Sequence, residues 1–233
     1  TDKCIQFATG NSAGNIMPRT SWSELKQYEF TLPPLPEQKK IASILTSVDD
    51  VIEKTQAQIA KLQDLKTGMM NELLTNGIGH TEFKDSELGR IPNSWIVSPI
   101  GDLVGSVTGG VSVNSENRAK SDGELGILKT SCISDGIFFP MEHKAILKAE
   151  VQRVHTSVKK DTIIFSRMNT PNLVGQSGYI EEDANDLYLP DRLWAIEVKD
   201  REVISTRWLS QLLASRNMRT RITDFATGTS GSM

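Results

Sequence analysis

One long stretch of the chain places its hydrophobic residues at the spacing of a coiled coil. Between Pro36 and Asn76 there is no internal proline and only one glycine, Gly68. Hydrophobic side chains recur in alternating steps of four and three residues, interrupted only by Thr55 and Lys66. This heptad spacing predicts a helix that packs along one seam. The predicted coiled-coil interface consists of Ile41, Leu45, Val48, Ile52, Ile59, Leu62, Met69 and Leu73.

Residues that stop or cap helices mark both ends of this stretch. The prolines of Leu32–Pro36 favour extended backbone up to Leu35, and Pro36 suits the first turn of a helix. Gly77, after Asn76, supplies the left-handed residue that follows a last helical turn. About 40 residues make a rod of roughly 60 Å. Such a rod cannot bury its own seam, and residues 77–233 show no helix of matching length, so we expect a partner helix outside the sequence shown.

The pattern changes after residue 90, where short β-rich runs alternate with turn residues. We expect strands at Trp95–Val97, Gly126–Leu128, Ile137–Phe139, Thr162–Phe165, Gly178–Ile180 and Leu193–Val198. Turns are expected at Ser134–Gly136 and Thr108–Gly110, and a helix at about Ser205–Arg221. The predicted fold class is therefore α+β, with a mixed globular domain attached to a long coiled-coil helix.

A short repeat suggests how these parts are ordered. The run Phe7-Ala-Thr-Gly-Asn-Ser12 recurs as Phe225-Ala-Thr-Gly-Thr-Ser230, which indicates two copies of one kind of domain. We interpret residues 1–34 as the C-terminal segment of a preceding domain and residues 35–76 as the spacer helix. Residues 77–90 are then a linker, and residues 91–233 are a second domain that lacks its last segment.

Composition excludes several classes of protein. The chain has 233 residues, a net charge of −3, two cysteines and three histidines. Two cysteines are too few for a disulfide scaffold, and the histidines have no ligand spacing, so we expect reduced thiols and no metal site. No apolar run is long enough to cross a membrane, and no signal peptide is visible, so we expect a cytoplasmic protein without membrane contact.

Motifs for catalysis are missing as well. The sequence contains neither a phosphate-binding G-x-x-x-x-G-K-[ST] loop nor a strand-borne G-x-G-x-x-G turn. The acidic run Glu181–Asp183, followed by Asn185 and Asp186, indicates a solvated loop rather than a metal site. We therefore expect no catalytic residue and no cofactor in this chain.

Basic residues near the C-terminal end point instead to nucleic acid. Between Arg201 and Arg221 there are five arginines and one acidic residue, Glu202. Arginine, small hydroxyls and glycine N–H groups commonly contact a phosphate backbone. The predicted contacts here are Arg216, Arg219, Arg221, Thr227 and Ser230. The alternative is a solvated helix face whose arginines form ion pairs.

A polar loop after the expected strand Thr162–Phe165 is the second candidate for DNA contact. Arginine can pair with guanine and asparagine with adenine through two hydrogen bonds. The loop carries Arg167, Asn169, Thr170 and Asn172, unless these side chains only satisfy their own turn. Further candidates are Lys159 and Lys160, which touch phosphate or mark a turn, and Arg192, which lies beside Asp191.

Three segments carry a resemblance to a known family. The run from Leu32 to Leu45 resembles the start of the conserved helical region of the DNA-specificity subunit of type I restriction-modification enzymes. Ile91–Trp95 resembles the opening of that family's target-recognition domains. Phe225–Met233 resembles the run before each domain's closing segment. This order covers essentially the whole chain.

The resemblance implies a non-catalytic subunit that reads double-stranded DNA. In that family two recognition domains, held apart by two antiparallel helices, each read half of a bipartite site. Methyltransferase subunits dock on the assembly and use S-adenosylmethionine, and restriction subunits that require magnesium and ATP join for cleavage. This chain has one nearly whole domain and one helix, so its antiparallel partner helix comes from another copy or from the missing part of the subunit. The alternatives are a coiled-coil scaffold with a protein-binding domain, or a nucleic-acid enzyme, which the missing motifs disfavour.

Overall fold

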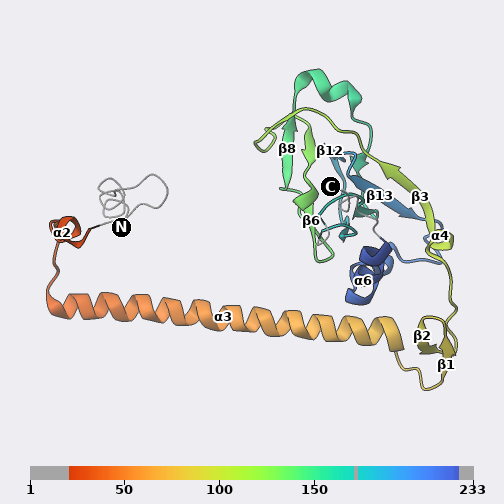
Figure 1. The fold of residues 1–233 in the computed structure, drawn as a ribbon, viewed down its shortest axis with the longest axis horizontal. Coiled ribbons are helices and arrows are strands. Elements are labelled where there is room, and N and C mark those ends of the chain that lie inside the picture. The colour runs from red at the N-terminus through yellow and green to blue at the C-terminus, as the bar shows by residue number, and fades with distance from the viewer. Residues whose placement is uncertain (1–20, 171–172, 226–233) are drawn as a thin grey trace, which may run out of the picture. The chain divides into compact units, whose positions relative to one another are not determined.

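The computed structural model describes residues 21–170 and 173–225 (Figure 1). The chain forms two compact units, residues 1–62 and 63–233, and their boundary lies within the long helix α3 (Leu35–Asn76). A short helix, α2 (Trp22–Leu25), precedes α3. Within the described residues, no helix is both long enough and apolar enough to span a bilayer.

Helix α3 confirms the predicted long helix and both of its ends. It starts at Leu35, where the backbone N–H of Gln38 donates to Pro34 O at 3.1 Å and its side-chain amide donates to Pro33 O at 2.7 Å. It stops at Gly77, whose φ of 69° is left-handed and whose N–H donates to Leu73 O at 3.2 Å. This single bond closes the last turn, as a glycine after a helix is expected to do.

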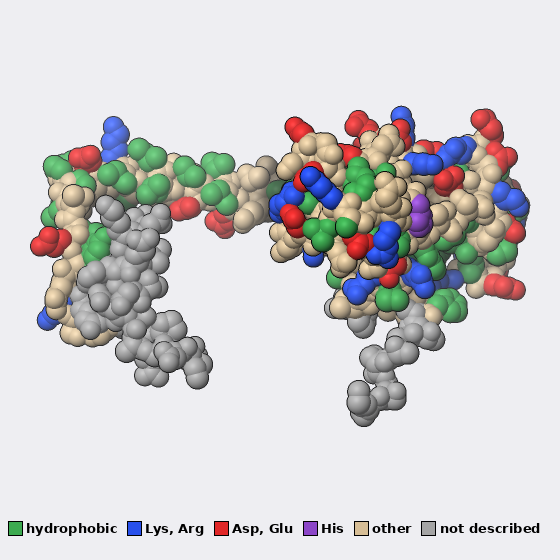
Figure 2. All heavy atoms as spheres, turned by 90° about the horizontal axis from the view of Figure 1, so that it is seen from above, with side chains coloured by type: hydrophobic (Ala, Val, Ile, Leu, Met, Phe, Trp, Pro, Cys, Tyr) green, Lys and Arg blue, Asp and Glu red, His purple; other side chains and the backbone are tan. Residues whose placement is uncertain are grey.

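The hydrophobic seam of α3 is uncovered in this chain. The helix has no buried residue, and the eight predicted interface residues are between 43% and 64% exposed. Figure 2 shows hydrophobic side chains along the part of the helix that is visible from this side. The polar seam residue Thr55 turns its hydroxyl back to Val51 O at 2.7 Å, so it is satisfied within its own helix. The coiled-coil interface itself stays a prediction.

A β-hairpin that the sequence pattern does not predict begins in the expected linker and ends at Pro92. Strands β1 (Phe83–Ser86) and β2 (Gly89–Pro92) pair antiparallel around a two-residue turn. The Ser86 hydroxyl donates to Gly89 O at 2.6 Å and accepts from Leu88 N at 3.2 Å, and Gly89 has a φ of 102°. The turn is therefore stabilised by its own residues. The two strands lack the alternation of apolar and polar residues that marks a half-buried strand, so the sequence does not predict them. Trp95–Val97, expected as a strand, has no regular structure.

Two sheets build the globular domain. The four-stranded sheet has the antiparallel order β11 (Ser177–Tyr179), β10 (Ile163–Ser166), β13 (Leu193–Val198) and β3 (Val104–Gly109). The five-stranded sheet has the order β4 (Ser115–Glu116), β8 (His143–Ile146), β5 (Gly126–Leu128), β12 (Ala184–Tyr188) and β9 (Ser157–Val158). In the five-stranded sheet β5 and β12 run parallel. The α+β fold class is thus confirmed.

Shorter elements connect the two sheets. A second small hairpin joins β6 (Ile133–Ser134) to β7 (Ile137–Phe138) through the predicted turn, where Asp135 and Gly136 both have positive φ. Helix α4 (Ile100–Leu103) leads into β3, and short 3₁₀ helices occupy Thr130–Cys132 and Lys148–Arg153. Helices α5 (Thr206–Ala214) and α6 (Arg216–Phe225) complete the domain.

The four-stranded sheet lies between two hydrophobic cores because its strands alternate their side chains. Leu193 and Ala195 of β13 join a cluster with Leu128 and Leu187 of the five-stranded sheet. The next residues along β13, Ile196 and Val198, join a cluster with α5. Burial in the first cluster raises the pKa of the Cys132 thiol to about 12, so this cysteine stays protonated at neutral pH.

Most of the expected strands of the domain are confirmed, and three local expectations are wrong. Strands β5, β7, β10, β11 and β13 agree with the sequence to within one residue at each end. The expected helix Ser205–Arg221 is two helices, because Ser215 has extended backbone and accepts from Met218 N as the cap of α6. Thr108 and Gly109 belong to β3 rather than to a turn. Asn185 and Asp186 lie in β12, whose Leu187 is buried in the core.

Candidate nucleic-acid interface

Strand pairing brings several predicted residues to one end of the four-stranded sheet. Ser166 of β10 pairs with Leu193 of β13, and Trp194 pairs with Gly109 of β3. Because these strands are antiparallel, the segment after β10 and the segment before β13 emerge side by side. Arg167 and Arg192 therefore lie together, although they are far apart in the sequence. We call the described residues that emerge here, and the helix that contacts them, the arginine end of the sheet: residues 167–170 and 173–176, Asp191, Arg192 and α6.

The polar loop at the arginine end is anchored mainly through its backbone. Gly175 N donates to Ser166 O at 2.8 Å, and Ser166 N donates to Gln176 O at 2.7 Å, so the loop closes on itself. Arg167 N and Met168 N donate to Arg192 O at 3.0 and 3.4 Å. The loop is thus fixed at both ends without using the side chains of Arg167 or Thr170.

The side chain of Arg167 lies over an aromatic stack. Its guanidinium carbon is 5.6 Å from the centre of the Trp194 ring, a cation–π distance. Trp194 in turn stacks on Phe165, with ring centres 6.1 Å apart and planes 17° from parallel. Among the described residues, the Arg167 guanidinium has no hydrogen-bond or ion-pair partner. The sequence predicts Trp194 only as a strand residue. Its position beside Arg167 follows from the pairing of β10 with β13, which the sequence pattern does not give.

Asn169 is largely committed to the loop itself. Its side-chain oxygen accepts from Thr170 N at 2.9 Å, and its amide nitrogen lies 3.4 Å from Ser166 Oγ. Asn169 is half-buried, whereas Thr170 is exposed. At Asn169 the structure therefore favours the alternative interpretation of the loop, in which the side chain bonds to its own turn and not to DNA. Asn172 lies outside the described residues.

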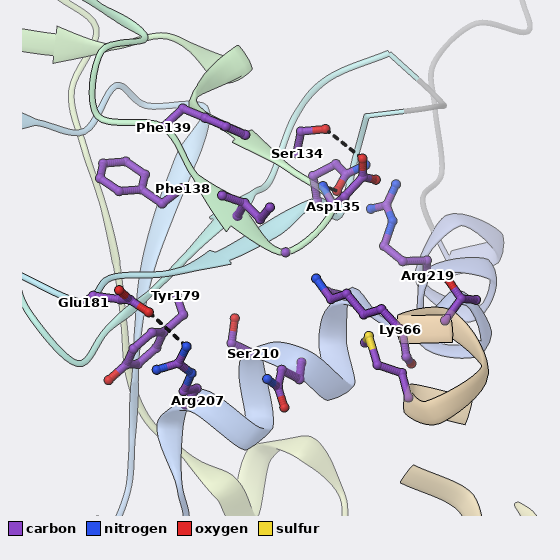
Figure 3. A pocket seen from close by; sticks show the side chains of 18 of the residues that line it. Lys66, Ser134, Asp135, Phe138, Phe139, Tyr179, Glu181, Arg207, Ser210 and Arg219 are labelled. Carbon is purple, nitrogen blue, oxygen red and sulfur yellow. Dashed lines mark hydrogen bonds and ion pairs between the residues drawn. The ribbon is translucent and has the colours of Figure 1, made fainter. Parts of the chain in front are cut away.

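Arg219 connects α6 to the same loop. Its guanidinium donates to Val174 O at 2.5 Å, and burial lowers the pKa of the Arg219 side chain, against the nearby charge of Asp135. Figure 3 shows Arg219 extended toward the Asp135 turn. Gly175, with a φ of 76°, lies so close to Ile222 that an added Cβ would be 2.4 Å from its side chain. Arg219 is therefore placed to hold the loop.

Arg216 and Arg221, the other two predicted arginines of α6, are exposed. Within the described part of the chain, neither guanidinium has a hydrogen-bond or ion-pair partner. Both are free to meet phosphate. Thr227 and Ser230, predicted to lie next to them, fall outside the described residues.

Lys159 and Lys160 lie at the opposite end of β10 from Arg167. They occupy the turn before β10, where Lys160 N donates to Asp183 Oδ1 at 2.8 Å. Acidic groups share this end: Asp161 pairs with Arg201 at 2.8 Å and accepts from the Tyr179 hydroxyl at 3.1 Å. Burial, and then donation to Asp161, raise the pKa of Tyr179. The structure thus separates the two lysines from the arginine end and gives them mixed surroundings.

Two of the five arginines between Arg201 and Arg221 form ion pairs. This agrees with the alternative interpretation of that segment, a solvated face whose arginines pair with acidic residues. Arg201 pairs with Asp161, and Arg207 pairs with Glu181 at 3.0 Å while lying over the Tyr179 ring. Figure 3 shows Arg207 pointing to Glu181 beside Tyr179. No group of three or more metal-ligating side chains occurs among the described residues.

Comparison with known proteins connects the N-terminal part of the chain to one family. Residues 3–64 match the model of the type I restriction modification DNA specificity domain. Over 81 residues the chain is 44% identical to a putative type I restriction enzyme MjaX specificity subunit of Methanocaldococcus jannaschii, covering 34% of this chain and 19% of the relative. This part of the chain is similar to the specificity subunits of type I restriction enzymes.

A second such specificity subunit, MjaVIII of the same organism, is 37% identical over 99 residues, 42% of this chain and 23% of its own length. The matched part of the chain thus covers about a fifth of the length of these two specificity subunits. Among solved structures, the HsdS subunit of Thermoanaerobacter tengcongensis aligns over 94% of this chain and 50% of its own, with 13% identity and a TM-score of 0.41. A chain from a study of type I R-M complex assembly aligns over 94% and 52%, with 15% identity and a TM-score of 0.43.

Proposed function

We propose that this chain recognises double-stranded DNA as a non-catalytic part of a type I restriction-modification complex in the cytoplasm. The observation that carries the proposal is the arginine end of the sheet, in a chain whose relatives are named specificity subunits. Arg167 and Arg192 lie together there, and Arg219 of α6 bonds to the same loop at Val174 O. Asp191 and Asp224 are the acidic residues among the described part of this end, against five arginines, so the surface attracts a polyanion.

In this proposal, two kinds of contact with DNA have different tasks. Arg216 and Arg221 are exposed cations that suit phosphate, which positions a protein on DNA without reading its sequence. The loop beginning at Arg167 presents polar groups that suit base edges. In this proposal the domain reads one half of a bipartite site. Methyl transfer with S-adenosylmethionine and cleavage with magnesium and ATP belong to partner subunits.

The test is binding to duplex DNA as salt is varied. A random duplex pool is selected on the purified chain, and the affinity for the selected sequence is measured between low and moderate salt. Phosphate contacts give a log–log slope near −0.9 per contact. Arg216→Gln with Arg221→Gln removes two charges from the arginine end, and Lys159→Gln with Lys160→Gln is the matched control at the other end of β10. We expect the first pair to reduce the slope by about two and the control to leave it unchanged. Binding without salt dependence would favour the scaffold alternative.

We also propose that α3 pairs with a second helix in antiparallel orientation. The seam has the same alternation of four and three residue steps when counted from either end. Two copies of α3 can therefore pair antiparallel, with Ile41 facing Leu73 and Ile52 facing Leu62. Lys66 would face Val48, where its long side chain can reach water past the seam. The outer surface of this pair is the proposed platform for methyltransferase subunits.

The mass of the chain in solution tests the helix pair. Sedimentation equilibrium of the 233-residue polypeptide should give a dimer. A monomer at micromolar concentration would mean that the partner helix is not a second copy. In that case, mixing with a peptide from the matching region of a full-length subunit should bury the seam, and failure of both would exclude the paired helix.

A further inference from the structure

The arginines at the arginine end differ in how firmly their side chains are held. Arg219 is fixed to Val174 O by a hydrogen bond of its own guanidinium. Arg192, Arg216 and Arg221 are exposed, and no described residue orients them. Arg167 alone combines a fixed position over an aromatic ring with N–H groups that no described residue uses.

We propose that Arg167 is the specificity-determining residue of this surface, that it reads a guanine, and that Trp194 is the residue that positions it. The inference rests on the proposed function and names the base read at that site. The Arg167 side chain is exposed, and no described residue uses the N–H groups along the edge of its guanidinium. That edge carries the fork of N–H donors that matches O6 and N7 of guanine in the major groove.

The surroundings of Trp194 explain why this position is fixed. Phe165 stacks on one side of its ring, and Gly109 on the neighbouring strand lies where an added Cβ would be 3.7 Å from Trp194 Cδ1. The backbone next to Arg167 is tied to Arg192 O by two N–H groups. Both ends of the Arg167 side chain are therefore held before DNA arrives. An arginine positioned in advance loses less conformational freedom on binding than one that is free.

Guanine is favoured over adenine because of what Asn169 already does. Reading adenine through asparagine needs both the oxygen and the nitrogen of the amide. The oxygen of Asn169 already accepts from Thr170 N, and its nitrogen lies beside Ser166 Oγ. Asn169 would have to give up these contacts, whereas Arg167 gives up none.

The experiment measures discrimination rather than affinity alone. The wild-type chain is used to select its preferred duplex from a random pool, and each guanine of that site is then replaced in turn. For the wild type, replacing one particular guanine should weaken binding about tenfold to a hundredfold. Arg167→Gln should lose discrimination at that position and keep it elsewhere. Arg167→Lys should keep only part of it, because lysine can donate to guanine but lacks the planar fork. Lys199→Gln, just beyond the opposite end of β13 from Arg192, is the control and should keep the full pattern.

The positioning role of Trp194 is tested by a measurement that a purely structural role of this residue would not change. Trp194→Phe keeps a flat ring and should retain most of the discrimination at the same guanine. Trp194→Leu should lose it while the slope of affinity against salt stays constant, because the phosphate contacts remain. Thermal unfolding of both variants shows whether the domain is folded. If Trp194→Leu does not fold, the comparison of Arg167→Lys with Arg167→Gln still decides the role of Arg167.

Several results would overturn the proposal. If Arg167→Gln lowers the salt slope by about one and keeps every base preference, Arg167 is a phosphate contact. If the lost preference is for adenine, the assignment of the base is wrong. If the wild type discriminates and Arg167→Gln discriminates equally, this inference fails while the proposed function stands. A wild-type chain that selects no sequence overturns both.

Discussion

The long helix and the globular domain use hydrophobic residues in opposite ways. Helix α3 has ten heptad positions in its seam and no buried residue. The domain buries Leu193, Leu209 and Leu213 to 1% exposure or less, in two cores on either side of one sheet. A leucine contributes to stability only where other atoms cover it. The domain therefore carries its own stability, whereas the seam of α3 contributes only after a partner helix arrives.

Breaking the seam should give the largest effect. Ile52→Asp puts a charge into the predicted interface, and a buried unpaired charge costs about 3–5 kcal/mol. We expect the dimer to weaken by roughly a hundredfold or more, as measured by sedimentation equilibrium. Ala57→Asp places the same charge on the outer side of the same helix and is the control. Equal effects of the two substitutions would exclude the predicted seam.

The same residue type, truncated in both regions, measures the difference directly. Leu193→Ala removes a fully buried side chain and should lower the free energy of unfolding of the domain by about 3 kcal/mol. Leu62 is 64% exposed, so Leu62→Ala should leave domain unfolding within about 0.5 kcal/mol of wild type. Urea unfolding followed by tryptophan fluorescence gives both values. A large loss in Leu62→Ala would show that α3 is part of the domain's cooperative unit.

Two glycines of the domain, one against α6 and one in open space, test whether α6 holds the loop. Gly175 and Gly123 have φ values of 76° and 79°, so alanine is strained at either position. Only at Gly175 would the new Cβ meet Ile222, at 2.4 Å, while Gly123 has open space. We expect Gly123→Ala to cost about 1 kcal/mol and Gly175→Ala about 2–3 kcal/mol, as measured by thermal unfolding. Equal costs would show that α6 does not hold the loop.

The smallest effect is expected from acid. The Arg118 guanidinium donates to both oxygens of Glu124, at 2.7 and 2.9 Å, and lowers the pKa of that carboxyl from 4.5 to about 2. A carboxyl with a lowered pKa in the folded state adds stability above its unfolded pKa and loses it as the pH falls toward the folded value. Wild type should therefore exceed Arg118→Gln in urea midpoint above pH 4.5, and the gap should close toward pH 2. A gap that stays constant with pH would mean that the ion pair is not its cause.

The sequence predicts the helix better than the domain for a physical reason. The length of α3 follows from its repeated steps, and its ends follow from Pro36 and Gly77, which act within a few residues. The hairpin Phe83–Pro92 is missed because its strands carry no apolar alternation, although Ser86 and Gly89 are turn residues. Strand β12 is missed because Asn185 and Asp186 favour loops. Its pairing with β5 and β9, together with the burial of Leu187, outweighs that preference.

The candidate site was predictable in its residue types and not in its grouping. Arg167 and Arg192 were both candidates, and antiparallel pairing of β10 with β13 brings them together. Lys159 and Lys160 were candidates on the same chemistry, and the same strand carries them to the opposite end. The contact of Arg219 with Val174 O depends on where α6 packs, which no local pattern encodes.

The loop after Ser166 is held by bonds to main-chain oxygens, which affects how its sequence can evolve. Val174 O, Arg192 O and Ser166 O accept the bonds that hold the loop, and a carbonyl oxygen is supplied by any amino acid. These acceptors take four bonds, and replacing the side chain at positions 167, 168 or 170 by any residue other than proline removes none of the bonded atoms. Under the proposed function, substitutions at these few positions can therefore change the recognition preference while the hydrogen bonds that hold the loop stay the same.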